Sequence, residues 1–75
     1  MTKAFVLIET AVGKNKEAVN ELRQLQGVKS ADKVTGPYDV IATIEVETLD
    51  DIDELVTAKI QPIPDIDRIL TCVAI

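Results

Sequence analysis

The sequence predicts an α+β fold whose elements follow the order β-α-β-β-α-β. Two strand-like segments, Ala4–Ile8 and Tyr38–Glu47, are apolar on both faces in their central parts, and two amphipathic helical segments lie between strands. The two halves of the chain also share a weak pattern at an offset of roughly 38 residues. Two right-handed β-α-β units joined by one hairpin give the ferredoxin-like arrangement, an antiparallel four-stranded sheet with both helices on one face.

The first half contains a strand, a helix and a second strand. Ala4–Ile8 is a continuous apolar run, which is typical of a buried central strand. Lys14–Gln26 has the apolar stripe of an amphipathic helix, with Asn15 as the expected N-cap and Gly27 at the C′ position. Val28–Val34 is more polar and carries two lysines, which favours a sheet edge.

A tight turn then leads into the longest strand. Gly36 permits positive φ and Pro37 presets φ for a turn position. From Tyr38 to Glu47 β-branched residues alternate with period 2, but Ile41 and Thr43 make the outward side apolar as well. Both faces of this strand therefore need a cover.

The second half contains the other helix and the last strand. Thr48–Asp51 has the spacing of a capping box, and Pro62 ends the helix that follows. Ile66–Ile75 is the last strand, in which Cys72 is expected to be a small buried hydrophobe. One face of this strand carries Ile69, Thr71, Val73 and Ile75, and the other carries Leu70, Cys72 and Ala74.

Length and composition predict a single domain over residues 1–75 that depends on a partner subunit. A chain of 75 residues buries a modest share of its surface. One cysteine and no histidine exclude an internal disulfide and the usual zinc sites, so oligomerisation is the remaining way to stabilise it. Because two helices cover one face of the sheet, we expect the aliphatic open face to form a homodimer.

The composition also excludes several functions. A net charge of −5 argues against direct nucleic-acid binding, and no apolar run is long enough for a membrane span. A free cysteine without an export signal indicates the cytoplasm. Without histidine, and with Tyr38 as the one tyrosine, the chain lacks the usual catalytic pairs, so we expect no enzyme, no metal and no cofactor.

Residues Val34–Asp39 read Val-Thr-Gly-Pro-Tyr-Asp, and Ile63–Ile66 read Ile-Pro-Asp-Ile. In these motifs and in its order of elements the chain resembles the C-terminal effector domain (RAM domain) of Lrp/AsnC-type transcription regulators. It departs from them at Pro37, where the family often has a polar residue. It also looks like a stand-alone RAM protein, because no helix-turn-helix precedes Met1.

The resemblance implies an amino-acid sensing module without its own DNA-binding domain. By this resemblance, two chains are expected to dimerise through their sheets, and the dimers are expected to assemble into octameric or decamer-like rings. An amino acid would be held at the contact between dimers. The resemblance also implies that the ligand is contacted by Gly36, Tyr38, Asp39 and Thr71. It further implies mixed assembly with full-length Lrp/AsnC-type regulators.

Alternative readings remain open for the candidate residues and for the function. In these alternatives Gly36 is needed for the turn alone, Asp39 accepts hydrogen bonds from local backbone N–H groups, and Tyr38 fills the core. Thr71 can be a plain β-forming residue. The function itself has two alternatives, a structural oligomerisation partner without a ligand and a dimeric ferredoxin-like barrel enzyme.

Overall fold

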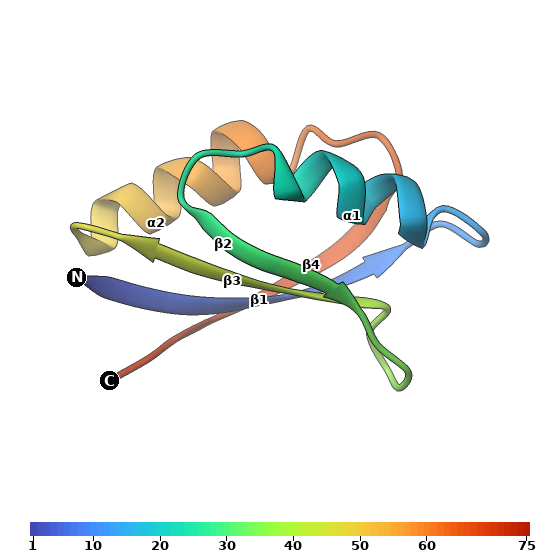
Figure 1. The fold of residues 1–75 in the computed structure, drawn as a ribbon, viewed down its shortest axis with the longest axis horizontal. Helices are drawn as coiled ribbons and strands as arrows, with labels where there is room; N and C mark the ends of the chain where they lie inside the picture. Colours follow the sequence, from blue (N-terminus) through green and yellow to red (C-terminus); the bar gives the residue numbers. More distant parts are fainter.

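The protein, described by a computed structural model that covers residues 1–75, has the predicted order of elements (Figure 1). The elements are β1 (Thr2–Thr10), α1 (Asn15–Arg23), β2 (Val28–Lys33), β3 (Val40–Val46), α2 (Leu49–Leu55), a π-helical turn η1 (Val56–Ile60) and β4 (Ile66–Val73). The predicted α+β, ferredoxin-like fold is confirmed.

The sheet has the strand order β2-β3-β1-β4, and every neighbouring pair is antiparallel. The two strands with apolar residues on both faces, β1 and β3, are the central pair. The lysine-bearing β2 lies at one edge, as predicted, and β4 lies at the other. Both helices cover the same face of the sheet, and the opposite face has no helix over it (Figure 1).

The core lies between this sheet and its helices. Ala4, Val6 and Ile8 alternate toward the helices on β1, and Val40, Ala42 and Ile44 do so on β3; all six are fully buried. The helices contribute Val19, Leu22, Ile52, Leu55, Val56 and Ile60. The offset of roughly 38 residues between the two halves relates Val6 on β1 to Ile44 on β3. Both residues are fully buried on the helix-facing side of a central strand, as this internal similarity predicts.

Helix α1 is shorter than predicted. It begins at Asn15 and ends at Arg23, so Lys14 takes the N-cap position and makes no side-chain cap hydrogen bond. The prediction of Asn15 as N-cap is therefore wrong. Gly27 lies beyond the helix end, but its φ of 97° has the positive sign that favours glycine. Arg23 Nε donates to the Ala31 carbonyl at 2.9 Å and ties the end of α1 to β2.

Helix α2 has the predicted capping box. Thr48 Oγ1 accepts from the Asp51 N–H, and the Asp51 carboxylate accepts from the Thr48 N–H, both at 3.2 Å. The helix then widens into the π-turn η1, where the Gln61 N–H donates to the Val56 carbonyl. Ile52, Val56 and Ile60 are all buried, and their spacing of four residues places them on one face of the continuous α2–η1 segment.

Replacing Thr48 by alanine is expected to lower the free energy of unfolding by about 1 kcal/mol, because the first turn of α2 loses an acceptor for one of its free N–H groups. Urea denaturation measures this loss. Thr57→Ala, at an exposed position of η1, serves as the control and should change stability by less than about 0.5 kcal/mol. An equal decrease in the free energy of unfolding of both variants would contradict a stabilising contribution from the capping box.

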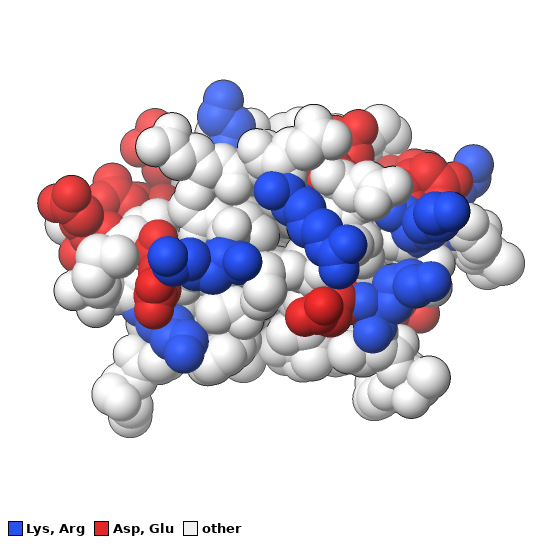
Figure 2. Space-filling model, viewed as in Figure 1, with Lys and Arg blue, Asp and Glu red and all other residues white.

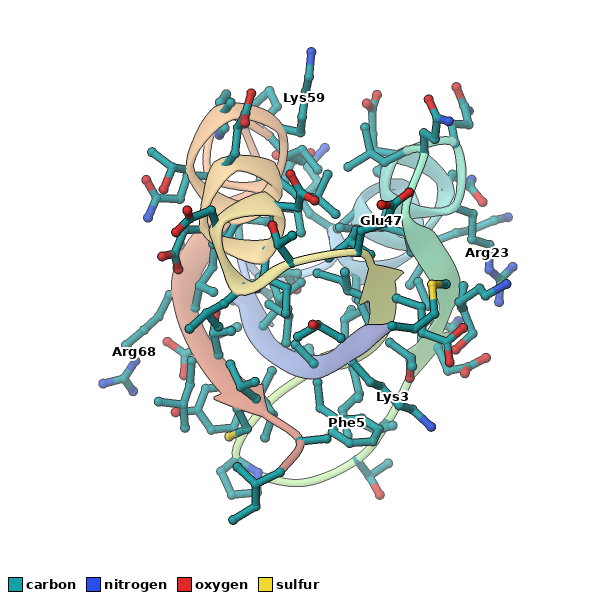
Figure 3. All side chains as sticks on the ribbon, turned by 90° about the vertical axis from the view of Figure 1, so that its left-hand side faces the viewer. Lys3, Phe5, Arg23, Glu47, Lys59 and Arg68 are labelled. Carbon is teal, nitrogen blue, oxygen red and sulfur yellow. The ribbon has the colours of Figure 1, made fainter.

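The uncovered side of the sheet is called the open face below. Its central residues are Phe5 and Leu7 of β1, Ile41 and Thr43 of β3, and Leu70 and Cys72 of β4. Phe5 is 38% and Leu70 47% exposed. In Figure 3 Phe5 projects from β1 away from the helices, and the Lys3 Nζ lies 5.4 Å from the centre of its ring.

The prediction that Cys72 is a buried small hydrophobe is wrong for the single chain. Its thiol is exposed, and on β4 it lies opposite Phe5 of β1. The strand alternation places it on the open face, because Thr71 and Val73 take the helix-facing positions. A subunit packed on the open face would cover Cys72.

Candidate functional site

The candidate site begins at the turn between β2 and β3. The Val34 N–H donates to the Asp39 carbonyl at 2.8 Å and closes the turn. Gly36 has a φ of 137°, so the backbone requires glycine there. No other atom lies within 4 Å of the place where a Cβ would stand, so the surface beside Gly36 is open.

Asp39 is fixed by hydrogen bonds from both its backbone and its side chain. Its N–H donates to the Ile8 carbonyl at 2.9 Å, which extends the β1–β3 pairing to the residue just before β3 begins. Its Oδ2 accepts from the Thr10 N–H at 2.9 Å, and the Thr10 hydroxyl lies 3.4 Å away. The carboxylate thus takes the place of a backbone carbonyl as the partner of Thr10.

The Asp39 carboxylate can accept more hydrogen bonds than it accepts within the chain. Oδ1 makes no hydrogen bond within the chain, and Asp39 takes part in none of the ion pairs. An ionised carboxylate can accept about four hydrogen bonds. A half-buried carboxylate whose orientation is fixed, and which lacks a cationic partner, can accept from an ammonium group of a ligand.

The other candidate side chains, Tyr38 and Thr71, differ in whether the fold brings them close to Asp39. Tyr38 is half-buried, lies outside the core cluster, and makes no hydrogen bond through its hydroxyl. Thr71 lies on β4, with β1 between it and β3, and it is paired with Val6 on the helix-facing side. A single chain therefore brings Gly36, Tyr38 and Asp39 together but does not bring Thr71 to them.

Thr10 is the contact of Asp39 that sequence reasoning missed. It is the one buried polar residue of the chain, at 7% exposure. The signal was present, because Thr10 continues the alternation of Ala4, Val6 and Ile8 toward the helices. A buried hydroxyl needs a hydrogen-bond partner, and Asp39 is the partner here.

No helix in the structure has the length and apolar character that crossing a bilayer requires.

A family model described as the Lrp/AsnC ligand binding domain matches residues 3–75. Among solved structures, the crystal structure of FFRP-DM1 is 41% identical in sequence, with a TM-score of 0.95 over 100% of both chains. Hypothetical protein PHS023 from Pyrococcus horikoshii is also 41% identical, with a TM-score of 0.94 over 100% of this chain and 90% of that one.

A more distant structure has the same fold at low sequence identity. The complex of the transcriptional regulator NMB0573 from Neisseria meningitidis with L-Met is 13% identical, with a TM-score of 0.86. The match covers 99% of this chain and 49% of that one. Among curated protein sequences, none matches this chain.

Proposed function

Because this chain belongs to the Lrp/AsnC ligand-binding domain family, we propose that it is a regulatory module that binds an amino acid at the Gly36–Asp39 turn. The observation that carries the proposal is the Asp39 carboxylate, whose Oδ2 is held by Thr10 while Oδ1 has no partner. This geometry suits the α-ammonium group of an amino acid. The L-Met complex of the Neisseria regulator supports the same ligand class.

The turn offers complementary groups for the rest of the ligand. Backbone N–H groups at a positive-φ glycine can hold a carboxylate, and Gly36 is open to solvent. Tyr38 is the expected wall of the pocket. In one chain the site is open on one side and Thr71 is distant, so we place the ligand between dimers, where a neighbouring subunit closes the pocket and supplies Thr71.

Replacing Asp39 by asparagine is expected to weaken amino-acid binding by roughly 10- to 100-fold, because a hydrogen bond to a charged group contributes about 1.5–3 kcal/mol. Asparagine keeps an oxygen that can accept from the Thr10 N–H, so the turn should stay folded. Isothermal titration of wild type and variant with each of the twenty common amino acids measures the effect.

Asp53→Asn removes the same charge from an exposed position of α2 and should leave every titration unchanged. Wild type that gives no heat with any amino acid while its assembly is intact would refute ligand binding. The alternative function, an oligomerisation partner without a ligand, would then be the better account. Equal affinity of wild type and Asp39→Asn would refute the site but not the function.

We also propose that the open face forms a homodimer, and that dimers assemble into a larger ring that can include full-length Lrp/AsnC-type regulators. Exposure of Phe5 and Leu70 in neighbouring strands supports the dimer, because an apolar patch of this kind is uncommon on a monomer. A second copy also buries Cys72. Mixed assembly would carry the amino-acid signal to subunits that bind DNA.

A further inference from the structure

Thr10 is a buried polar residue whose hydroxyl has a single partner. It is 7% exposed, and its Oγ1 makes its one hydrogen bond to Asp39 Oδ2, at 3.4 Å. The pairing of β1 with β3 ends at Ile8 and Val40, so the Thr10 N–H has no partner on β3 and donates to the same Oδ2, at 2.9 Å. One oxygen of Asp39 therefore accepts from both donors that Thr10 has.

The backbone of Thr10 is fixed on its other side by β4. Thr10 is paired with Ile66 at the start of that strand. The next residue, Ala11, donates its N–H to the Asp65 carbonyl at 2.9 Å. The end of β1 is thus held between the β2–β3 turn and β4, and a side chain that contacts Thr10 is held by paired backbone and not by a mobile loop.

The Asp39 backbone is fixed as well, which leaves rotation of its side chain as the remaining freedom. Its N–H donates to the Ile8 carbonyl, and its carbonyl accepts from the Val34 N–H. A carboxylate that rotates freely loses that freedom when a ligand binds, and the loss lowers the affinity. With Oδ2 held by Thr10, Oδ1 has a fixed orientation before a ligand arrives.

Asp39 carries the single charge of the turn. Residues 34–38 are uncharged, and the tip of the turn is white at the lower right of Figure 2. None of the four ion pairs of the chain includes Asp39. The direction of its Oδ1 therefore decides where the turn attracts an ammonium group.

We propose that Thr10 is a positioning residue of the ligand site: its hydroxyl and its N–H hold Asp39 so that Oδ1 faces the ammonium group of the amino acid. This role rests on the proposed function and adds a residue of β1 to a site otherwise built from the β2–β3 turn. Thr10 acts through Asp39, because its side chain is buried and both of its donors are used. Since the hydroxyl is the group that matters, serine should replace threonine and valine should not.

Two variants of Thr10 separate the hydroxyl from the rest of the side chain. Thr10→Val is expected to weaken amino-acid binding by roughly 5-fold, the effect of one lost hydrogen bond, and Thr10→Ser to stay within about twofold of wild type. Thr57→Val, at an exposed position of η1, should bind like wild type. Isothermal titration with each of the twenty common amino acids measures the affinities, and circular dichroism verifies folding.

The combination of Thr10→Val with Asp39→Asn tests whether Thr10 acts through Asp39. Asparagine presents no charge to the ammonium group, so its orientation has little effect, and adding Thr10→Val should weaken binding by less than about twofold further. An equal loss in both backgrounds would show a general structural effect of the valine and would overturn the proposal. Thr10→Ser that binds as weakly as Thr10→Val would also overturn it, and so would Thr10→Val that binds like wild type.

Crystal structures of wild type and Thr10→Val without ligand separate a failure of this inference from a failure of the proposed function. Wild type should have the Asp39 carboxylate in one orientation, and Thr10→Val should have it divided between that orientation and one turned toward solvent. A carboxylate that keeps the single orientation in Thr10→Val overturns the inference and leaves the proposed function standing. Wild type that binds no amino acid, although Thr10 holds the carboxylate, refutes the proposed function and with it the ligand role of Thr10.

Discussion

Replacing Phe5 by aspartate is expected to convert the proposed homodimer into a folded monomer. Phe5 lies in the middle of the open face, on the central strand β1, with Thr43 and Cys72 as its cross-strand neighbours. Each dimer contains two copies, and each buried aspartate would cost about 2 kcal/mol or more without a partner. The dimer dissociation constant should therefore rise by roughly 1,000-fold. Sedimentation equilibrium over a range of concentrations measures it.

The control places the same substitution outside the open face. Leu49 is 54% exposed, but it lies at the start of α2, where an aspartate is compatible with the helix dipole. Leu49→Asp should dimerise like wild type. Leu70→Asp, on β4 of the open face, should dissociate the dimer as Phe5→Asp does. Full dimerisation of both open-face variants would place the interface elsewhere.

Ile44→Ala is expected to give the largest loss of stability, about 2–5 kcal/mol in the free energy of unfolding. Ile44 is fully buried on the central strand β3 and packs in the core between sheet and helices. Loss of its side chain removes buried apolar surface and leaves a cavity that the paired strands β1 and β2 cannot close. Urea denaturation at one fixed protein concentration measures the change, because the proposed dimerisation would contribute to apparent stability.

Ile75→Ala removes the same atoms from a side chain that is fully exposed, at 122%. Its effect should remain within about 0.5 kcal/mol. A loss at Ile44 below about 1 kcal/mol would mean that the core tolerates the cavity, contrary to the close packing expected of a small domain.

The sequence predicted the sheet better than the helix ends. Strand positions followed from alternation, because a shift of one residue would move every side chain to the other face. The capping box at Thr48 was equally clear, since its two hydrogen bonds are local. The N-terminus of α1 was wrong by one residue, because no side chain caps it and nothing local fixes its start. The π-turn after Leu55 was not predicted.

The candidate site was predicted in part. The Gly36–Asp39 turn could be found because its glycine and aspartate are adjacent in the chain and belong to one motif. The contact with Thr10 joins residues 29 positions apart, and only the pairing of β1 with β3 brings them together. Whether an amino acid occupies the turn remains a prediction.

The sequence by itself determined the order of the elements, the two central strands and the need to cover both faces of the sheet. These follow from local rules, namely side-chain period and turn chemistry, which each segment satisfies alone. The tertiary structure alone decided that Thr10 holds the Asp39 carboxylate and that Cys72 lies on the open face. Those features depend on the relative positions of distant segments, which are fixed only when the strands pair and the helices pack.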